Sequence, residues 1–243
     1  IFKIPFGKKG QKLFAQFISK RRAPKSSKLY AQIGGRSPLH PNTLLQAEAL
    51  QKKLREVGDY QVHVGHRYWH PLIPETIEKI SHESFDKIVL LPLFPQYSNT
   101  TTLSLINEWV RYGEKLIAPL IIQRFHQDPL YIKSSCERIV DKLDSFSEKP
   151  HLLFSAHSIP QKRVDQGDPY KQEIEETVDL IMEDLHGYGH SLCYQSKVGP
   201  IKWLKPSIGG ELKELVSHGI KNLLIVPVGF VCEDLETLYE LDI

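Results

Sequence analysis

Short apolar runs that alternate with longer amphipathic stretches constrain the fold of this chain most. Most of the runs are almost continuously apolar, as strands covered on both faces are. We expect strands at 60–65, 87–93, 117–123, 151–155, 191–195 and 222–226. Between them, apolar residues recur at helical spacing, as in Ile174, Val178 and Ile181, and again over 47–57. This alternation predicts an α/β fold with parallel sheets flanked by helices.

Composition excludes several functional classes. The chain has 243 residues, of which 41% are hydrophobic, so it can bury a sizeable core. A net charge of +2 gives no reason to expect nucleic acid as a partner. The three cysteines form no C-x-x-C pair, which favours a reducing compartment and argues against a thiolate metal site. No apolar run approaches the roughly 20 residues of a membrane span, and no signal peptide is visible. We therefore expect a cytoplasmic protein.

In parallel α/β folds, ligands bind where strands end and loops begin. After the strand at 87–93, Phe94 and Tyr97 bracket a Pro-Gln turn. The hydroxyl-rich segment 100–102 follows them. These threonines either cap the next helix or leave its N-terminus free to hold an anion such as a propionate.

His157 follows the predicted strand at 151–155, so rigid structure would anchor it within reach of a ligand. Its imidazole titrates near neutrality and binds metals, although a lone histidine is often structural. Ser155 and Ser158 flank it, but the Gly-x-Ser-x-Gly elbow of a serine hydrolase is absent from the sequence. Further on, Trp203 follows a Gly-Pro turn and either offers a flat apolar face to a ligand or caps the core.

The C-terminal segment is unusually acidic. If it forms a helix, Glu233, Glu236 and Glu240 fall at i, i+3 and i+7 on one face, with Asp234 beside them. Like charges repel, so this arrangement favours a bound cation or a shared proton. Fe(II) accepts carboxylate and imidazole ligands together. A preference for acids in the first helical turn is an alternative explanation for Glu233 and Asp234.

Seven segments, in order and over nearly the whole chain, closely resemble the signature segments of the ferrochelatase family, bacterial type. They are Arg21–Pro24, Ile33–Pro38, Arg67–Pro71, Pro95–Ser98, Phe154–Pro160, Tyr194–Pro200 with Trp203, and Glu236–Asp242.

The resemblance implies two similar Rossmann-like domains, each a parallel four-stranded sheet flanked by helices, with the active-site cleft between them. We place an N-terminal chelatase domain at 1–125 and a C-terminal one at 126–243. The family has an apolar strand before the position of Ile1 and further helices after that of Ile243. We therefore expect the first strand and the C-terminal helices to be missing.

The implied reaction is insertion of Fe(II) into protoporphyrin IX to form protohaem, the last step of haem biosynthesis. By resemblance, His157 either takes the pyrrole protons or ligates the iron, and Glu236 is the catalytic glutamate opposite it. Glu233, Asp234 and Glu240 match an acidic path for metal or protons.

Further matching positions lie in and around the family's cleft. Those expected to contact the porphyrin are Ser37, Arg67, Phe94, Tyr97, Thr100 and Trp203, and those at the cleft lip are Phe2, Arg21 and Arg22. The lip arginines belong to a basic run that would contact substrate carboxylates or an anionic membrane, or would simply form a solvated loop. A cytoplasmic enzyme peripheral to the inner membrane is compatible with this run.

The sequence departs from the family pattern in several places. Asn99 stands where animal enzymes carry a cysteine ligand, so we expect no iron–sulfur cluster and no tightly bound cofactor, with iron as a substrate only. Asp234 replaces a common histidine, and Arg36 a common glycine. Alternatives are a related chelatase for another metal or for coproporphyrin, or a non-catalytic haem-binding module. The chain would act as a monomer or a homodimer.

Overall fold

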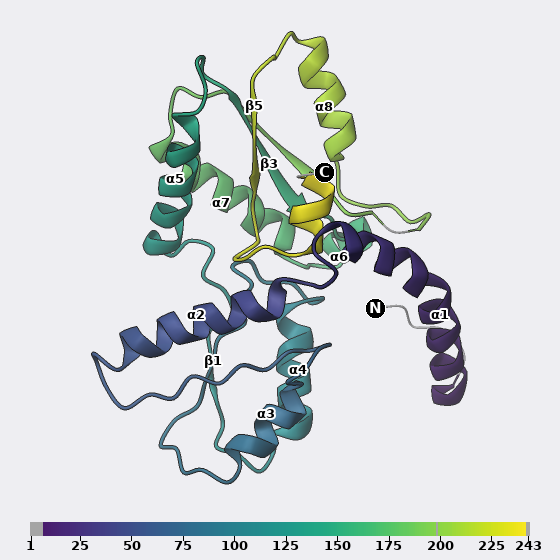
Figure 1. The fold of residues 1–243 in the computed structure, drawn as a ribbon, viewed down its shortest axis with the longest axis vertical. Coiled ribbons are helices and arrows are strands. Elements are labelled where there is room, and N and C mark those ends of the chain that lie inside the picture. The colour runs from purple at the N-terminus through teal and green to yellow at the C-terminus, as the bar shows by residue number, and fades with distance from the viewer. Residues whose placement is uncertain (1–6, 198, 242–243) are drawn as a thin grey trace. The chain divides into compact units, whose positions relative to one another are not determined.

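The structure is a computed structural model that describes residues 7–197 and 199–241. Among these residues, three helices come first, and strands separated by one or two helices follow (Figure 1). In chain order the elements are α1 Lys8–Gln32, α2 Leu39–Leu54, α3 Ile73–Ile80, β1 Val89–Leu90, α4 Thr102–Tyr112, β2 Leu120–Ile121, α5 Pro129–Leu143, β3 His151–His157, α6 Gln161–Asp165, α7 Tyr170–Asp184, β4 His190–Gln195, α8 Ile208–Ser217, β5 Leu223–Pro227 and the π-helix η1 Glu236–Leu241. The predicted α/β class with parallel sheets flanked by helices is confirmed.

The chain forms two compact units. One unit spans 63–231 and contains both sheets, and the other combines 1–62 with 232–243. The division into chelatase domains at 1–125 and 126–243, with its boundary at the stretch around His126–Pro129, stays a prediction.

The larger sheet has the order β4-β3-β5, and all three strands are parallel. Leu152 and Phe154 of β3 are fully buried in a cluster that includes residues of α5 and α7. Leu153, whose side chain points to the opposite face, packs with Cys193 and with Leu215 of α8. The sheet is therefore covered on both faces, which explains the apolar runs of β3 and β5.

The smaller sheet consists of β1 and β2, which pair in parallel with Val89 opposite Leu120. Ile73 and Ile77 of α3 pack with Trp109 of α4 and with Leu90 of β1. Both strands are much shorter than the predicted runs at 87–93 and 117–123.

The sheets of the described residues contain two and three strands, so the expected four strands in each are not formed there. One predicted strand, at 60–65, is wrong. The side-chain amide of Gln51 on α2 donates to the Tyr60 carbonyl at 2.7 Å and accepts from the Val62 amide at 2.8 Å. A side chain thus satisfies backbone groups that a neighbouring strand would otherwise pair.

The N-terminal helix α1 carries Arg21 and Arg22, and both side chains are exposed. The basic segment is therefore helical, and the alternative of a solvated loop is wrong for its backbone. Within the described ranges, no helix is long and apolar enough to cross a membrane.

The predicted helix over 47–57 begins earlier and ends at Leu54, and none of its described residues is buried.

Candidate functional site

His157 is the last residue of β3, in the centre of the larger sheet. It lies opposite Gln195, the last residue of β4. The amide of Ser158 donates to the Gln195 carbonyl at 2.8 Å, and the hydroxyl of Ser155 donates to the Gln195 side chain. His157 is half-buried, while both serines are buried. The backbone on both sides of His157 is thus fixed by neighbouring strands, as its position after a buried strand predicts.

Trp203 lies on a loop that pairs with the segment directly after His157. Pro160 and Trp203 form an antiparallel bridge, and the amide of Leu204 donates to the Ile159 carbonyl at 3.2 Å. Leu204 is fully buried in the core, whereas Trp203 is only half-buried. Leu204 therefore fills the core position, and the indole of Trp203 is held near the end of β3.

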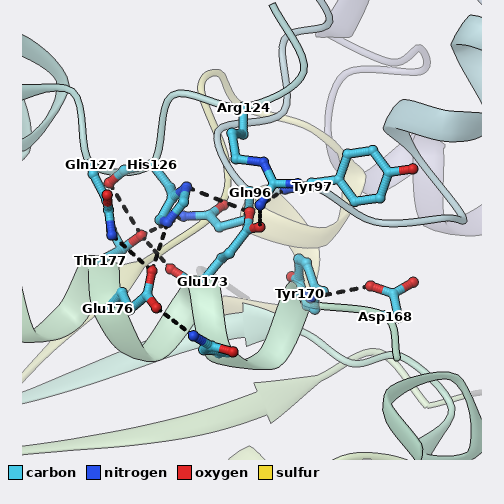
Figure 2. A network of polar contacts seen from close by, with 11 residues as sticks. Gln96, Tyr97, Arg124, His126, Gln127, Asp168, Tyr170, Glu173, Glu176 and Thr177 are labelled. Carbon is cyan, nitrogen blue, oxygen red and sulfur yellow. Dashed lines mark hydrogen bonds and ion pairs between the residues drawn. The ribbon is translucent and has the colours of Figure 1, made fainter. Parts of the chain in front are cut away.

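The loop after β1 carries Tyr97 and is attached to α7 (Figure 2). The amide of Tyr97 donates to Oε2 of Glu173 at 2.6 Å, and Arg124 forms an ion pair with the other oxygen of that carboxylate. The guanidinium carbon of Arg124 lies 5.1 Å from the centroid of the Tyr97 ring. Phe94 and Thr100 on the same loop are half-buried.

The start of α4 is held by a carboxylate from the turn before α7. Asp168 accepts from the Ser98 hydroxyl and from the Asn99 amide, both at 2.9 Å. The Thr100 and Ser98 hydroxyl oxygens lie 2.8 Å apart. Thr101 is the N-cap residue, yet its side chain makes no capping hydrogen bond. The explanation that a threonine hydroxyl caps α4 is therefore not observed at Thr101. Asp168 places a negative charge just before this helix.

Arg67 has protein partners in the structure. Its guanidinium forms an ion pair of 3.2 Å with Glu108 of α4 and lies 4.8 Å from the centroid of the Tyr68 ring. Its side chain retains an exposed fraction of 31%. A role in porphyrin binding stays a prediction for this residue.

In the acidic segment, Asp234 caps the π-helix. Its Oδ1 accepts from the amides of Glu236 and Thr237, both at 2.9 Å, and the Thr237 hydroxyl donates to Glu233. The helix begins after Glu233, so the expectation that Glu233 shares a helix face with Glu236 is wrong. The alternative explanation, that acids prefer a helix start, holds for Asp234. The side chain of Glu240 lies outside the described residues.

The charges of this segment also affect a neighbouring thiol. Burial raises the pKa of Cys232, and the carboxylates of Asp234 and Glu233 raise it further. The carboxylates of Asp234 and Glu233 therefore lie close enough to Cys232 to disfavour its thiolate.

Three further predicted positions, Ser37, Arg21 and Arg22, lie in the unit that combines 1–62 with 232–243. Ser37 accepts a hydrogen bond from the Leu39 amide at 3.3 Å at the start of α2, and Arg21 and Arg22 are exposed on α1. Phe2 lies outside the described residues. Among the residues that are described, no three His, Cys, Asp or Glu side chains are grouped to hold a metal ion.

Comparisons with known proteins identify the chain's relatives. The ferrochelatase family model matches residues 1–243. The chain belongs to the ferrochelatase family. It is 46% identical to the ferrochelatase of Aquifex aeolicus (strain VF5), over 100% of this chain and 77% of that protein. It is 43% identical to the ferrochelatase of Sulfurihydrogenibium sp. (strain YO3AOP1), over 100% of this chain and 78% of that protein.

A third ferrochelatase, from Gloeobacter violaceus (strain ATCC 29082 / PCC 7421), is 46% identical over 96% of this chain and 74% of its own length. The resemblance deduced from seven segments is thereby confirmed. The predicted enzyme class, a ferrochelatase of haem biosynthesis that handles iron and a porphyrin, is confirmed with it.

The sequence analysis did not single out the acidic residues that hold the Tyr97 loop, Asp168 and Glu173. The sequence contains one indication of Asp168, because this residue follows a glycine and precedes a proline at the start of a helix. Glu173 had none, because an acid in the first turn of a helix is ordinary.

Glu176, one turn after Glu173, is part of the same network of polar contacts (Figure 2). A hydrogen bond with His126 lowers the pKa of Glu176 most, and one with Gln172 lowers it further. His126 is buried, and its two ring nitrogens lie 2.9 Å from Glu176 and 3.5 Å from Glu173. The network thus combines two carboxylates of α7 with a histidine and an arginine from the segment after β2.

Proposed function

We propose that this chain inserts Fe(II) into protoporphyrin IX and releases protohaem and two protons. The family match over residues 1–243 carries the proposal. The geometry around His157 supports it, because a reactive imidazole has to be held rigidly at a substrate, and the ends of β3 and β4 hold this one.

The porphyrin sets the chemical task. A free-base porphyrin is planar, and its two N–H protons point inward, so a metal cannot enter while both remain in the plane. Bending the ring exposes nitrogen lone pairs to one face, which is strain directed toward the transition state. We propose that His157 acts on this face, either as the base that takes the pyrrole protons or as a ligand of the incoming iron.

Glu236 is proposed as the catalytic glutamate on the opposite side of the ring. It begins a π-helix, a rare element that is frequently found at functional sites. Glu233, Asp234 and Glu240 are proposed to form the acidic path that conducts metal or protons to it. The two hydrogen bonds at Asp234 would fix the backbone of Glu236 at the start of this helix.

The aromatic residues are proposed to pack against the flat face of the macrocycle, and the polar residues to orient it. Phe94, Tyr97 and Trp203 supply rings, and each is half-buried, so each keeps part of its surface for a ligand. Ser37, Arg67 and Thr100 are proposed to orient the substrate. Phe2, Arg21 and Arg22 are proposed for the cleft lip, where arginines would attract propionates or an anionic membrane surface.

The wider organisation is part of the same proposal. We propose chelatase domains at 1–125 and 126–243, each built on a four-stranded sheet, a monomer or homodimer, and no resident cofactor. The three cysteines form no disulfide with one another, which supports a reducing compartment such as the cytoplasm, with peripheral membrane contact through the basic helix.

Anaerobic mixing with Fe(II) and protoporphyrin IX tests the proposal directly. We expect free-base fluorescence to be lost at a rate that saturates with porphyrin, and the same with Zn(II). Coproporphyrin, which carries four carboxylates instead of two, is mixed in parallel, and faster insertion into it would identify coproporphyrin as the substrate. Tight haem binding without any insertion would establish the non-catalytic alternative instead.

A further inference from the structure

Glu173 is a buried carboxylate whose partners converge on one loop. Its side chain is only 3% exposed, in the first turn of α7. A charge in such a place is costly unless it is paired and hydrogen-bonded. The Tyr97 amide donates to one of its oxygens and Arg124 to the other, while a ring nitrogen of His126 lies 3.5 Å away.

Two of these partners act on the same residue. The amide of Tyr97 fixes the backbone from which the ring projects, and the guanidinium of Arg124 lies over the ring itself, 5.1 Å from its centroid (Figure 2). A planar guanidinium stacks on an aromatic face, and a charge-assisted bond to a carboxylate limits its freedom to leave that face. Glu173 therefore constrains both the backbone of Tyr97 and the cation that packs against its ring.

The neighbouring loop residues are held from the same side. Gln96 is 2% exposed, and its side-chain amide donates to the Thr177 hydroxyl of α7 at 2.8 Å. Ser98 and Asn99 both donate to Asp168. Residues 96–99 are thus fastened to α7 and the turn before it, so a change at Glu173 is transmitted to the ring of Tyr97 instead of being absorbed by a loose loop.

We propose that Glu173 is a positioning residue for porphyrin binding, which holds the ring of Tyr97 through Arg124 and through the loop backbone. The inference rests on the proposed function, in which Tyr97 packs against the macrocycle. Glu173→Gln keeps the size of the side chain and an acceptor for the Tyr97 amide, but it removes the charge that holds Arg124. Porphyrin affinity should then fall about 10-fold, while the insertion rate at saturating porphyrin changes little.

The test is a fluorescence titration with metal-free protoporphyrin IX, together with the KM and kcat of Zn(II) insertion. Glu176→Gln is the matched control, because Glu176 lies one turn later on α7 and contacts His126 and Gln127 but not the loop. We expect Glu176→Gln to bind porphyrin like the wild type. In a Tyr97→Ala background, Glu173→Gln should weaken binding no further, although it should still lower the thermal midpoint.

Unchanged affinity in Glu173→Gln would overturn the inference, and so would an equal loss in the presence and absence of the Tyr97 ring. If Glu173→Gln does not fold, Arg124→Gln tests the same idea, because it removes the cation over the ring and leaves the bond to the Tyr97 amide. The same dependence on Tyr97 is expected of it, and its absence would overturn the inference. A wild-type protein that neither binds nor metallates porphyrin would refute the proposed function instead.

Discussion

Gly229 lies just after β5, and its replacement by alanine should destabilise the unit of residues 63–231. Its φ is +88°, in the left-handed region that residues with a Cβ rarely adopt. A Cβ built at this position would lie 3.1 Å from the side-chain oxygen of Gln96 and 3.2 Å from Cδ1 of Ile174. Gly219 provides a matched control, because its φ is +80° and no heavy atom lies within 4 Å of its Cβ position.

The expected magnitudes follow from these two environments. A left-handed conformation costs a residue with a Cβ about 1–2 kcal/mol, and the lower entropy of the unfolded alanine chain returns about 0.4–1 kcal/mol. Gly219→Ala should therefore lose about 1 kcal/mol. Overpacking in a buried site adds about 1–3 kcal/mol. Gly229→Ala should therefore lose about 2–4 kcal/mol, because Ile174 is fully buried and Gln96 is bonded to Thr177.

Equilibrium unfolding in urea, followed by circular dichroism, measures both variants against the wild type. A difference of about 1–3 kcal/mol between Gly229→Ala and Gly219→Ala isolates the crowding, because both share the backbone strain. Porphyrin affinity should also fall in Gly229→Ala only, since Gln96 must move. Equal destabilisation of the two variants would refute the reasoning, because it would mean that the site around Gln96 has room for a methyl group.

Two further predictions concern a buried thiol and the helix cap. Burial raises the pKa of Cys193 from 9.0 to about 11. The folded state therefore keeps the proton to higher pH, so its stability is full well below pH 9, and about 2–3 kcal/mol is lost as the pH rises through 11. Urea unfolding of Cys193→Ala should show no such loss of stability at high pH. Parallel curves of unfolding free energy against pH for this variant and the wild type would contradict the prediction. Asp234→Ala should destabilise the start of the π-helix by about 1 kcal/mol, because two amides lose their acceptor. Asp234→Asn should restore this stability but not the insertion rate, and full activity of the Asn variant would exclude Asp234 from the acidic path.

The larger sheet could be predicted from the sequence because burial on both faces leaves a strong local signal. Leu152, Leu153 and Phe154 are all fully buried, so a polar residue inside this run would stand out in the sequence. The predicted strand at 60–65 was wrong because no comparable local signal exists there. Its backbone pairs with the side chain of Gln51, and nothing in so short a run of residues distinguishes a side-chain partner from a neighbouring strand.

For the candidate site, too, only features that depend on neighbouring residues in the sequence could be predicted. His157 follows a recognisable strand, so its place at the strand end could be derived. Glu173 could not be found, because its role depends on a contact with Tyr97 across 76 positions of sequence. The extent of the acidic helix was misjudged because Asp234 caps it, which places Glu233 outside the helix.

The most direct test of the proposed function is the rate of Fe(II) insertion by His157→Ala under anaerobic conditions, with iron and protoporphyrin IX both saturating. General acid–base catalysis contributes roughly 100- to 10,000-fold, so we expect a loss of that order. Porphyrin affinity should stay near that of the wild type, because His157 is assigned to the reacting nitrogens or iron and the aromatic residues to the ring faces. An insertion rate equal to that of the wild type would contradict the assignment of His157 as base or ligand.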